Sequence, residues 1–189
     1  MKNIGPTIGI LFSPPNPVLY ECAFAFIDIS EVLFVFTKGI GILPILASFI
    51  GGLFLWLLVE YFIHRFVFHH RSKSVILRKV VYAIHGVHHA FPTDHQRLYV
   101  PFVPALFMKG ILMMLFCVVF GWLGLTLLAG LVTMHQFYNL VHYFIHTDSF
   151  PHNPFLNRLR ANHLKHHRGH GEKCFGVTST FFDRLFGTL

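Results

Sequence analysis

Long apolar runs alternate along the chain with short polar stretches that are rich in histidine. Residues 39–63 are apolar apart from Ser48 and Glu60, which is enough length to cross a hydrocarbon core that needs about 20 residues. A second apolar tract, residues 102–145, is long enough to cross that core twice at a helical rise of about 1.5 Å per residue. The pattern therefore predicts one membrane span and, after a polar stretch, a helical hairpin.

The middle of the second tract favours a tight reversal of the chain. Residues 121–124, Gly-Trp-Leu-Gly, carry no charge, and they combine turn-permissive glycines with a tryptophan suited to the membrane interface. Lys109 lies in the first arm of the hairpin, so we expect its side chain to reach toward the surface or the span to begin after it. Residues 147–162 are expected to form a loop that leads into a helix carrying the last histidines.

Residues 18–37 leave two alternatives open. Glu21, Asp28 and Glu31 interrupt an otherwise apolar stretch there, and charged groups at bilayer depth are costly. The segment is therefore expected to form either a fourth span or a helix that lies in the membrane interface.

The composition supports a membrane protein. Hydrophobic residues make up 54% of the 189 residues and charged residues only 12%, which is too apolar for an ordinary soluble domain. We divide the chain into an N-terminal segment, residues 1–38, and a membrane domain, residues 39–189, which holds the metal site predicted below. The predicted fold is an all-α integral membrane protein with three to four transmembrane helices and a cytoplasmic, histidine-rich helical cap.

Positive charge gathers on one side of this predicted topology. The span that ends near residue 63 and the hairpin of residues 102–145 place the polar stretches on the same membrane side, together with most of the Lys and Arg. The positive-inside rule makes that side cytoplasmic, which predicts a multi-pass protein of a bacterial inner membrane or the endoplasmic reticulum. The basic residues are mixed with histidines and apolar runs instead of forming a polar arm, so nucleic acid is not expected as a partner.

Ten of the 15 histidines fall into four clusters. Spacings of three and four residues place imidazoles on one helical face, where they can converge on an ion, and imidazole is a common metal ligand. Five further histidines fit the ordinary role of a hydrogen-bonded side chain, namely His70, His95, His135, His152 and His170. The predicted metal ligands are His64, His69, His85, His88, His89, His142, His146, His163, His166 and His167.

Ten imidazoles exceed the four to six positions of one ordinary ion, so the sequence predicts two metal ions with about five histidines each. An imidazole-rich pair with open positions suits iron that binds dioxygen, whereas structural zinc prefers four closed ligands and often cysteine. The three cysteines, Cys22, Cys117 and Cys174, show no paired spacing. Because metal affinity rises toward zinc, purified protein can carry zinc in place of iron.

Three details of the pattern bear on the site. His64 and His69 are five residues apart, about 140° around a regular helix, so the helix either ends there or contains a π-bulge. Asn139 lies on the same stripe as the third cluster, where it either orients an imidazole or makes a polar contact between helices. Asp94 and Arg97 are expected either to form an ion pair that braces the ligand loop or to be an ordinary solvated pair or helix cap.

The clusters stand in distinctive local contexts: Glu60-Tyr-Phe-Ile-His64-Arg-Phe-Val-Phe-His69, His85-Gly-Val-His88-His89 followed by Pro92, Asp94, Arg97 and Leu98, Tyr138-Asn139, His142-Tyr-Phe-Ile-His146, His163-Leu-Lys-His166-His167, Phe175-Gly-Val-Thr-Ser179, Phe182-Asp183 and Phe186-Gly-Thr188. Through these residues the chain resembles the fatty acid hydroxylase and sterol desaturase superfamily over roughly residues 60 to 188. Within that superfamily it is most similar to the fatty acid 2-hydroxylases that act on sphingolipid acyl chains.

The resemblance implies that the ten histidines hold a dimetal centre at the cytosolic membrane surface. Four positions depart from the family's pattern, which bears on substrate choice and activity. Asn139 stands where the family has an aspartate, Thr147 where it has a histidine, Phe102 where it has a proline and Phe182 where it has a tryptophan.

The resemblance also implies a function. We expect a membrane-bound, non-haem di-iron oxygenase that hydroxylates a lipid acyl chain at the 2-position of a fatty acid or sphingolipid N-acyl chain. Dioxygen is the expected co-substrate and a separate protein such as cytochrome b5 or ferredoxin the expected electron donor; no catalytic residue is separable from the metal ligands. A sterol desaturase or carotenoid hydroxylase is the alternative within this chemistry. More distant alternatives are a metal transporter, whose ligands should lie near the bilayer midplane, and a catalytically inactive metal-binding scaffold.

Overall fold

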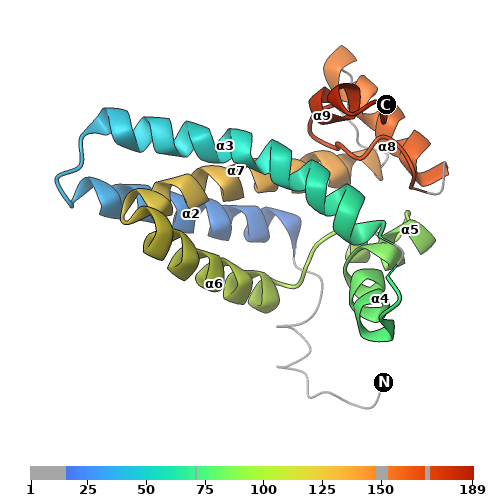
Figure 1. The fold of residues 1–189 in the computed structure, drawn as a ribbon, viewed down its shortest axis with the longest axis horizontal. Helices are drawn as coiled ribbons and strands as arrows, with labels where there is room; N and C mark the ends of the chain where they lie inside the picture. The colour runs from blue at the N-terminus through green and yellow to red at the C-terminus, as the bar shows by residue number, and fades with distance from the viewer. Residues whose placement is uncertain (1–15, 71, 148–152, 169–170) are drawn as a thin grey trace. The chain divides into compact units, whose positions relative to one another are not determined.

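The computed structural model describes residues 16–70, 72–147, 153–168 and 171–189, and over these residues the chain is helical with no strand. Its elements are α2 (Pro17–Phe36), α3 (Ile42–Ile63), η1 (His64–Phe68), α4 (Val75–Val81), η2 (Tyr82–Gly86), α5 (Val87–Ala90), η3 (His95–Arg97), α6 (Phe102–Phe120), α7 (Leu123–Ile145), α8 (Pro154–Arg168) and α9 (Phe181–Leu185) (Figure 1). The all-α prediction is confirmed for the described residues.

The chain forms two compact units. The first, here called the helical unit, contains the chain up to Phe54 together with Tyr99–Gln136, and the second, the histidine unit, contains Leu55–Leu98 and Phe137–Leu189. Two of the three boundaries between them fall inside long helices, α3 and α7. All ten predicted metal ligands belong to the histidine unit.

The predicted hairpin is confirmed by α6 and α7. α6 ends at Phe120 and α7 begins at Leu123, so the reversal falls on the predicted glycine-containing turn. Gly121 has a φ of +61°, a conformation that glycine adopts without strain. Beside this turn, Leu125 packs with Val35 and Ile45 in a buried apolar cluster that joins α7 to α2 and α3.

Glycines allow α3 and α7 to approach closely within the helical unit. A Cβ atom on Gly52 would lie 2.1 Å from the carbonyl oxygen of Leu127, and one on Gly130 would lie 2.0 Å from that of Phe49. Neither position has room for a side chain. Small residues of this kind let helices pack backbone against backbone in membranes, where van der Waals contacts take the place of the hydrophobic effect in holding helices together.

Lys109 departs from the expectation that it reaches the surface. Its side chain is buried, and its Nζ lies 2.5 Å from Oδ1 of Asp28 and 3.0 Å from Oε2 of Glu31. Asp28 also accepts hydrogen bonds from Gln136, at 3.0 Å, and Thr133, at 3.3 Å. The expectation was wrong because the acidic residues of α2 lie 78 and 81 positions away, and sequence spacing does not reveal such a pairing.

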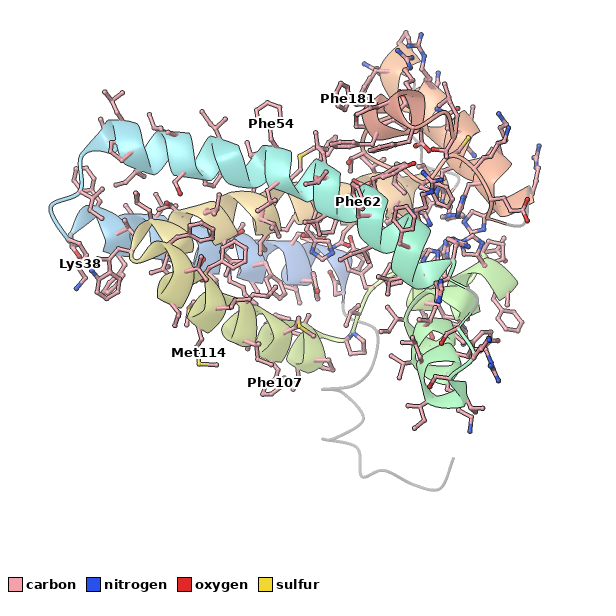
Figure 2. All side chains as sticks on the ribbon, viewed as in Figure 1. Lys38, Phe54, Phe62, Phe107, Met114 and Phe181 are labelled. Atoms are coloured by element: carbon pink, nitrogen blue, oxygen red, sulfur yellow. The ribbon has the colours of Figure 1, made fainter. Side chains whose placement is uncertain are left out.

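Two stretches of the described chain are long and apolar enough to cross a membrane, Ile42–Phe68 and His95–Phe120, with mean hydropathies of 2.4 and 2.3. Only 11% and 6% of their most apolar windows are buried, whereas a core helix of a soluble protein would be mostly buried. Large apolar side chains such as Phe54, Phe107 and Met114 project away from these helices (Figure 2). A bilayer would cover such a surface.

In the histidine unit, π-helical turns place two of the histidine clusters. η1 continues α3, and the backbone N–H of His69 donates to the carbonyl oxygen of His64 at 3.2 Å. Because a π-turn joins residues five apart, the two rings can share one face. Both sequence alternatives hold in part, because the helix ends at Phe68 and its last turn is π-helical. A second π-turn, η2, carries His85 between α4 and α5.

A second buried apolar cluster supports the other two histidine clusters. Val141 and Ile145 of α7 pack with Leu159 of α8 and with Val177 in the loop that follows α8. The helix that carries the last histidines is confirmed, although it begins at Pro154, within the range expected to be a loop. This packing brings the end of α7 against α8, so that their histidines face one another.

Candidate metal centre

The ten predicted ligands converge in two groups of five. Within each group, the ring nitrogens that could bind a metal all lie within 4.8 Å of one another. The first group contains His64, His69, His85, His89 and His166, and the second contains His88, His142, His146, His163 and His167. Each group could hold one metal ion.

The two His-x-x-His-His sequences link the groups. His85 and His89 of the first such sequence belong to the first group, whereas His88 belongs to the second. The sequence on α8 is divided the other way, with His166 alone in the first group. The groups are adjacent as a result, and the rings of His89 and His167 stack with centroids 4.2 Å apart.

The spacing between the rings fits a metal. Neighbouring Nε2 atoms lie 2.9–3.2 Å apart in both groups. Two nitrogens held at right angles around an ion, each at a typical distance of about 2.1 Å, would be separated by about 3.0 Å. The donor sets therefore suit ions with several cis imidazole ligands.

Backbone carbonyl groups fix the orientation of two rings in the first group. Nδ1 of His64 lies 2.5 Å from the carbonyl oxygen of Phe175, and Nδ1 of His166 lies 2.6 Å from that of Lys173. A carbonyl oxygen only accepts, so each Nδ1 carries the proton and each Nε2 keeps its lone pair. The Nε2 atom of His64 is buried and makes no hydrogen bond among the described residues, as expected of an atom placed to bind a metal.

Burial keeps these imidazoles neutral. It is the main cause that lowers the pKa of His89 to about 2 and that of His167 to about 3, and repulsion between neighbouring imidazolium rings adds to it. Burial likewise moves the pKa of His85 and of His163 well below the ordinary value of 6.5. The rings are uncharged at neutral pH, which is the form that binds metals.

Two buried carboxylates hold the loop that carries the orienting carbonyls. Asp183 accepts the backbone N–H groups of Phe175, at 2.9 Å, and Gly176, at 2.7 Å. Glu60 accepts that of Val177, at 2.5 Å, and both the backbone N–H, at 3.0 Å, and the hydroxyl of Thr178. This stretch, residues 173–178, is called the carbonyl loop below.

Sequence reasoning missed the role of these carboxylates. In the sequence Glu60 stands out only as a polar exception in an apolar run and, like Asp183, as part of the family resemblance. A charged residue in an apolar stretch is a signal in its own right, because a buried carboxylate needs several donors. Glu60 stands in such a stretch, between Val59 and Tyr61. Its partners lie 117 and 118 residues away, so the signal would not have identified them.

The other predicted site residues lie outside the two groups. Asn139 is buried, and no hydrogen bond joins its side chain to a histidine in the described part of the chain. Asp94 caps η3 and lies 2.6 Å from Nε of Arg97, which holds the pKa of its carboxyl below the usual range. This ion pair is exposed. His95 contacts the carbonyl oxygen of His146 at 3.1 Å, so one of the additional histidines braces a predicted ligand.

Two more of the five additional histidines lie within the described residues. His70 is exposed, and His135 lies on α7 within the helical unit and is a member of neither group. His152 and His170 lie outside the described residues.

The chain is similar to fatty acid hydroxylases over most of its length. The family model described as fatty acid hydroxylase matches residues 49–188. A relative from Macaca fascicularis, named fatty acid 2-hydroxylase, is 37% identical over 144 residues, which are 75% of this chain and 39% of that protein. A relative from Schizosaccharomyces pombe, named ceramide very long chain fatty acid hydroxylase scs7, is 38% identical and covers 79% of this chain and 44% of that protein.

Two further comparisons agree. Dihydroceramide fatty acyl 2-hydroxylase FAH2 of Arabidopsis thaliana is 33% identical over 73% of this chain and 58% of its own length. A solved structure titled full-length scs7p, with only the hydroxylase domain visible, is similar with a TM-score of 0.83 at 28% identity, covering 98% of this chain and 70% of that one. This chain thus spans less than two thirds of each of these three sequence relatives.

The family resemblance noted in the sequence is confirmed by these matches. The family model covers well over half of the residues and includes every histidine of both groups. This chain belongs to the fatty acid hydroxylase family.

Proposed function

We propose that the protein is a membrane-bound dimetal oxygenase that hydroxylates the acyl chain of a lipid at the 2-position, in a fatty acid or a sphingolipid N-acyl chain. The observation that carries the proposal is the pair of adjacent five-histidine groups. The names of the relatives support the substrate, because they are called fatty acid 2-hydroxylases or hydroxylases of ceramide and dihydroceramide acyl chains.

All ten histidines of the two groups are proposed as metal ligands. Two iron ions held there would activate dioxygen for insertion of one oxygen atom into a C–H bond, with electrons from a separate donor such as cytochrome b5 or ferredoxin. The nitrogen-only donor set also suits zinc, which binds such sites more tightly than iron.

The protein's own contribution is to orient the ligands and to exclude water. The Nδ1–H groups of His64 and His166 donate hydrogen bonds to backbone carbonyl oxygens of the carbonyl loop. These bonds orient Nε2 of each ring toward the metal position of the first histidine group. His88, His163 and His166 are each at most 2% exposed, so bulk water does not reach this part of the site. A dry, preorganised site of this kind lets one substrate carbon react without competing reactions of the solvent.

The proposed topology has four spans, α2, α3, α6 and α7. The burial of Asp28 and Glu31 against Lys109 supports α2 as a span, because it removes the three charges from lipid. Residues 39–189 form the proposed hydroxylase domain, and residues 1–38 contribute the first span. We place the metal centre on the cytoplasmic face of a bacterial inner membrane or the endoplasmic reticulum, where its basic residues can attract an acidic electron donor.

Lipid mass spectrometry tests this function. Cells that express the unaltered chain should gain one oxygen atom on acyl chains, and cells that express His88→Ala should not. His135→Ala, which changes a histidine outside both groups, is the matched control and should keep the product. Loss of two hydrogens would instead indicate a desaturase, and an unchanged lipid profile at normal expression would contradict oxygenase chemistry on lipids.

A further inference from the structure

The helix of residues 75–90 in the histidine unit presents an exposed apolar face. α4, η2 and α5 follow one another without a break and together form this helix. No residue of α4 is buried. Ile76 is 75% exposed, and Leu77 and Val80 are exposed as well. These three side chains lie within about 100° of one another around the helix, so they form a single stripe.

The other side of the same helix is occupied by the histidine groups. His85 and His88 are buried, and the ring of His85 stacks on that of Phe68, at the end of η1, with centroids 4.7 Å apart. The helix therefore cannot turn its apolar face inward without withdrawing these histidines. An exposed aliphatic stripe of this kind marks an interaction surface.

The charge around the helix indicates what this surface contacts. Residues 61–93 contain no Asp or Glu and five basic residues, namely Arg65, Arg71, Lys73, Arg78 and Lys79. Lys73 and Lys79 are exposed, and neither makes an ion pair with a carboxylate in the described part of the chain. Lys79 lies about 60° around the helix from Ile76, beside the apolar face. Aliphatic side chains flanked by unpaired cations complement a membrane surface with anionic headgroups.

Both ends of the helix are tethered to stretches that can cross a membrane. Ile42–Phe68 ends seven residues before Val75, and His95–Phe120 begins five residues after Ala90. Seven extended residues span at most about 25 Å. If these stretches cross the bilayer, the helix stays close to the membrane surface, and the bilayer is the apolar phase within its reach.

We propose that the helix of residues 75–90 lies in the headgroup layer of the membrane and binds anionic phospholipids. Ile76, Leu77 and Val80 lie among the acyl chains, and Lys73 and Lys79 bind lipid phosphate groups. The inference rests on the topology given under the proposed function, in which α3 crosses the membrane, and it adds the class of lipid that this surface takes. A choline headgroup carries its own cation, which opposes the two lysines, whereas phosphatidylglycerol carries a net negative charge. The surface therefore selects lipids of net negative charge.

Fluorescence quenching in nanodiscs tests this placement with the full chain. A chain with Cys22→Ser, Cys117→Ser and Ile76→Cys is labelled with the fluorophore NBD through a maleimide; the remaining cysteine, Cys174, is fully buried. The nanodiscs contain phosphatidylcholine alone or mixed with phosphatidylglycerol. One quencher is a nitroxide on a lipid acyl chain, and the other is a neutral nitroxide dissolved in water. A label at Asn157→Cys, an exposed polar position on α8, is the control and should be reached from water.

In the mixed nanodiscs the lipid nitroxide should quench the label at residue 76 more strongly than the water-soluble one. Lys73→Gln combined with Lys79→Gln should shift the equilibrium toward the undocked helix by about five-fold for each lysine removed. Phosphatidylcholine alone should shift it in the same direction. Arg158→Gln combined with Lys165→Gln, which removes two exposed charges from α8, is the matched control and should leave the quenching unchanged.

A label reached mainly by the water-soluble nitroxide in both kinds of nanodisc would overturn the proposal. So would shielding from both nitroxides, because protein, such as a second copy of the chain, would then cover the face. Equal quenching in both lipid mixtures and in the lysine variant would overturn the selectivity for anionic lipids. Val80→Cys, labelled in the same way, decides the placement if Ile76→Cys fails to fold.

This measurement needs neither an electron donor nor turnover, so it is separate from the test of the proposed function. Failure of that function would appear as a docked helix in a protein that forms no hydroxylated product. Failure of the proposed topology would appear as a chain that stays in solution without detergent or lipid, and that result would overturn the placement as well.

Discussion

At the scale of single residues, the carbonyl loop determines which ring nitrogen faces the first metal position. His64 and His166 each donate Nδ1–H to a backbone carbonyl of this loop. The loop in turn depends on Asp183, a fully buried carboxylate that accepts two backbone N–H groups and the hydroxyl of Thr188. Partners of this kind, one layer behind the ligands, typically change metal affinity by about 10–100-fold.

Asp183→Asn should therefore weaken the first metal position selectively. The amide replaces one accepting oxygen by a donor that faces a backbone N–H, so the loop shifts and the rings of His64 and His166 lose their support. We expect metal affinity at one position to fall by about 10-fold or more, measured by competition with a chelator. Asp94→Asn, at an exposed aspartate paired with Arg97, is the control; equal losses in both variants would contradict this role of the loop.

Gly171 offers a second residue-scale test. It has a φ of +71°, and a Cβ atom there would lie 2.2 Å from Cε1 of His69. Gly171→Ala should push this ring away from the first group and lower metal content there. Gly187→Ala has the same backbone strain, with a φ of +66°, but nothing within 4 Å of the added carbon. Elemental analysis should show a loss in the first variant alone, and a similar loss in both would mean that backbone strain is the cause.

The sequence predicted the ligands better than their surroundings. Clustering, at helical spacing in three of the four clusters, was enough to single out ten histidines that the structure brings together. The gap between His64 and His69 was enough to suggest the π-turn. Which ring joins which group could not be predicted, because residues such as His88 and His89 lie near the same face of one helix. The role of the backbone carbonyls of Lys173 and Phe175 could not be predicted either, because every residue has a backbone carbonyl and the residue type does not show which one accepts a hydrogen bond.

At the scale of elements, a buried charge network explains why α2 can be both acidic and apolar. Asp28 and Glu31 face Lys109 of α6, and Asp28 also faces Thr133 and Gln136 of α7. Three helices are thereby held together by polar contacts at depth. The alternatives left open for residues 18–37 arose because the partners of an acidic residue are set by tertiary packing, which the local pattern does not contain.

Lys109→Met should destabilise the helical unit. It leaves two buried carboxylates without their cation, and breaking a buried ion pair costs about 3–5 kcal/mol. Lys38→Met, at an exposed lysine over the rings of Phe34 and Trp122, should cost about 1 kcal/mol or less.

Thermal unfolding in detergent would measure this difference. Adding Asp28→Asn and Glu31→Gln to Lys109→Met should recover part of the lost stability, because no uncompensated charge then remains. Equal unfolding temperatures for Lys109→Met and the unaltered chain would show that this network does not hold α2.

At the scale of the whole molecule, the neutral histidines make the metal-free protein sensitive to acid. Burial lowers the pKa of His69 to about 4 and moves that of His163 well below 6.5, whereas in the unfolded chain both keep ordinary values near 6.5. Below about pH 6.5 the unfolded state therefore binds more protons than the folded state. The free energy of the unfolded state therefore falls relative to that of the folded state, and the free energy of unfolding decreases as the pH drops from about 6.5 toward 4.

Thermal unfolding of the metal-free chain in a pH series should show this decline. His163→Gln removes one buried group that resists protonation, so the decline should become less steep in that variant. A melting temperature that stays constant or rises between about pH 7 and pH 5 would contradict the proposed burial of neutral imidazoles.

The central claim is that two adjacent groups of five histidines each hold one metal ion. The most direct test is the metal-to-protein ratio of the purified chain, measured by elemental mass spectrometry after growth with added iron. The account predicts two ions per chain in total, about one in His85→Ala or in His142→Ala, and none when both changes are combined. A ratio of one or less in the unaltered chain, or two ions retained in the double variant, would contradict it.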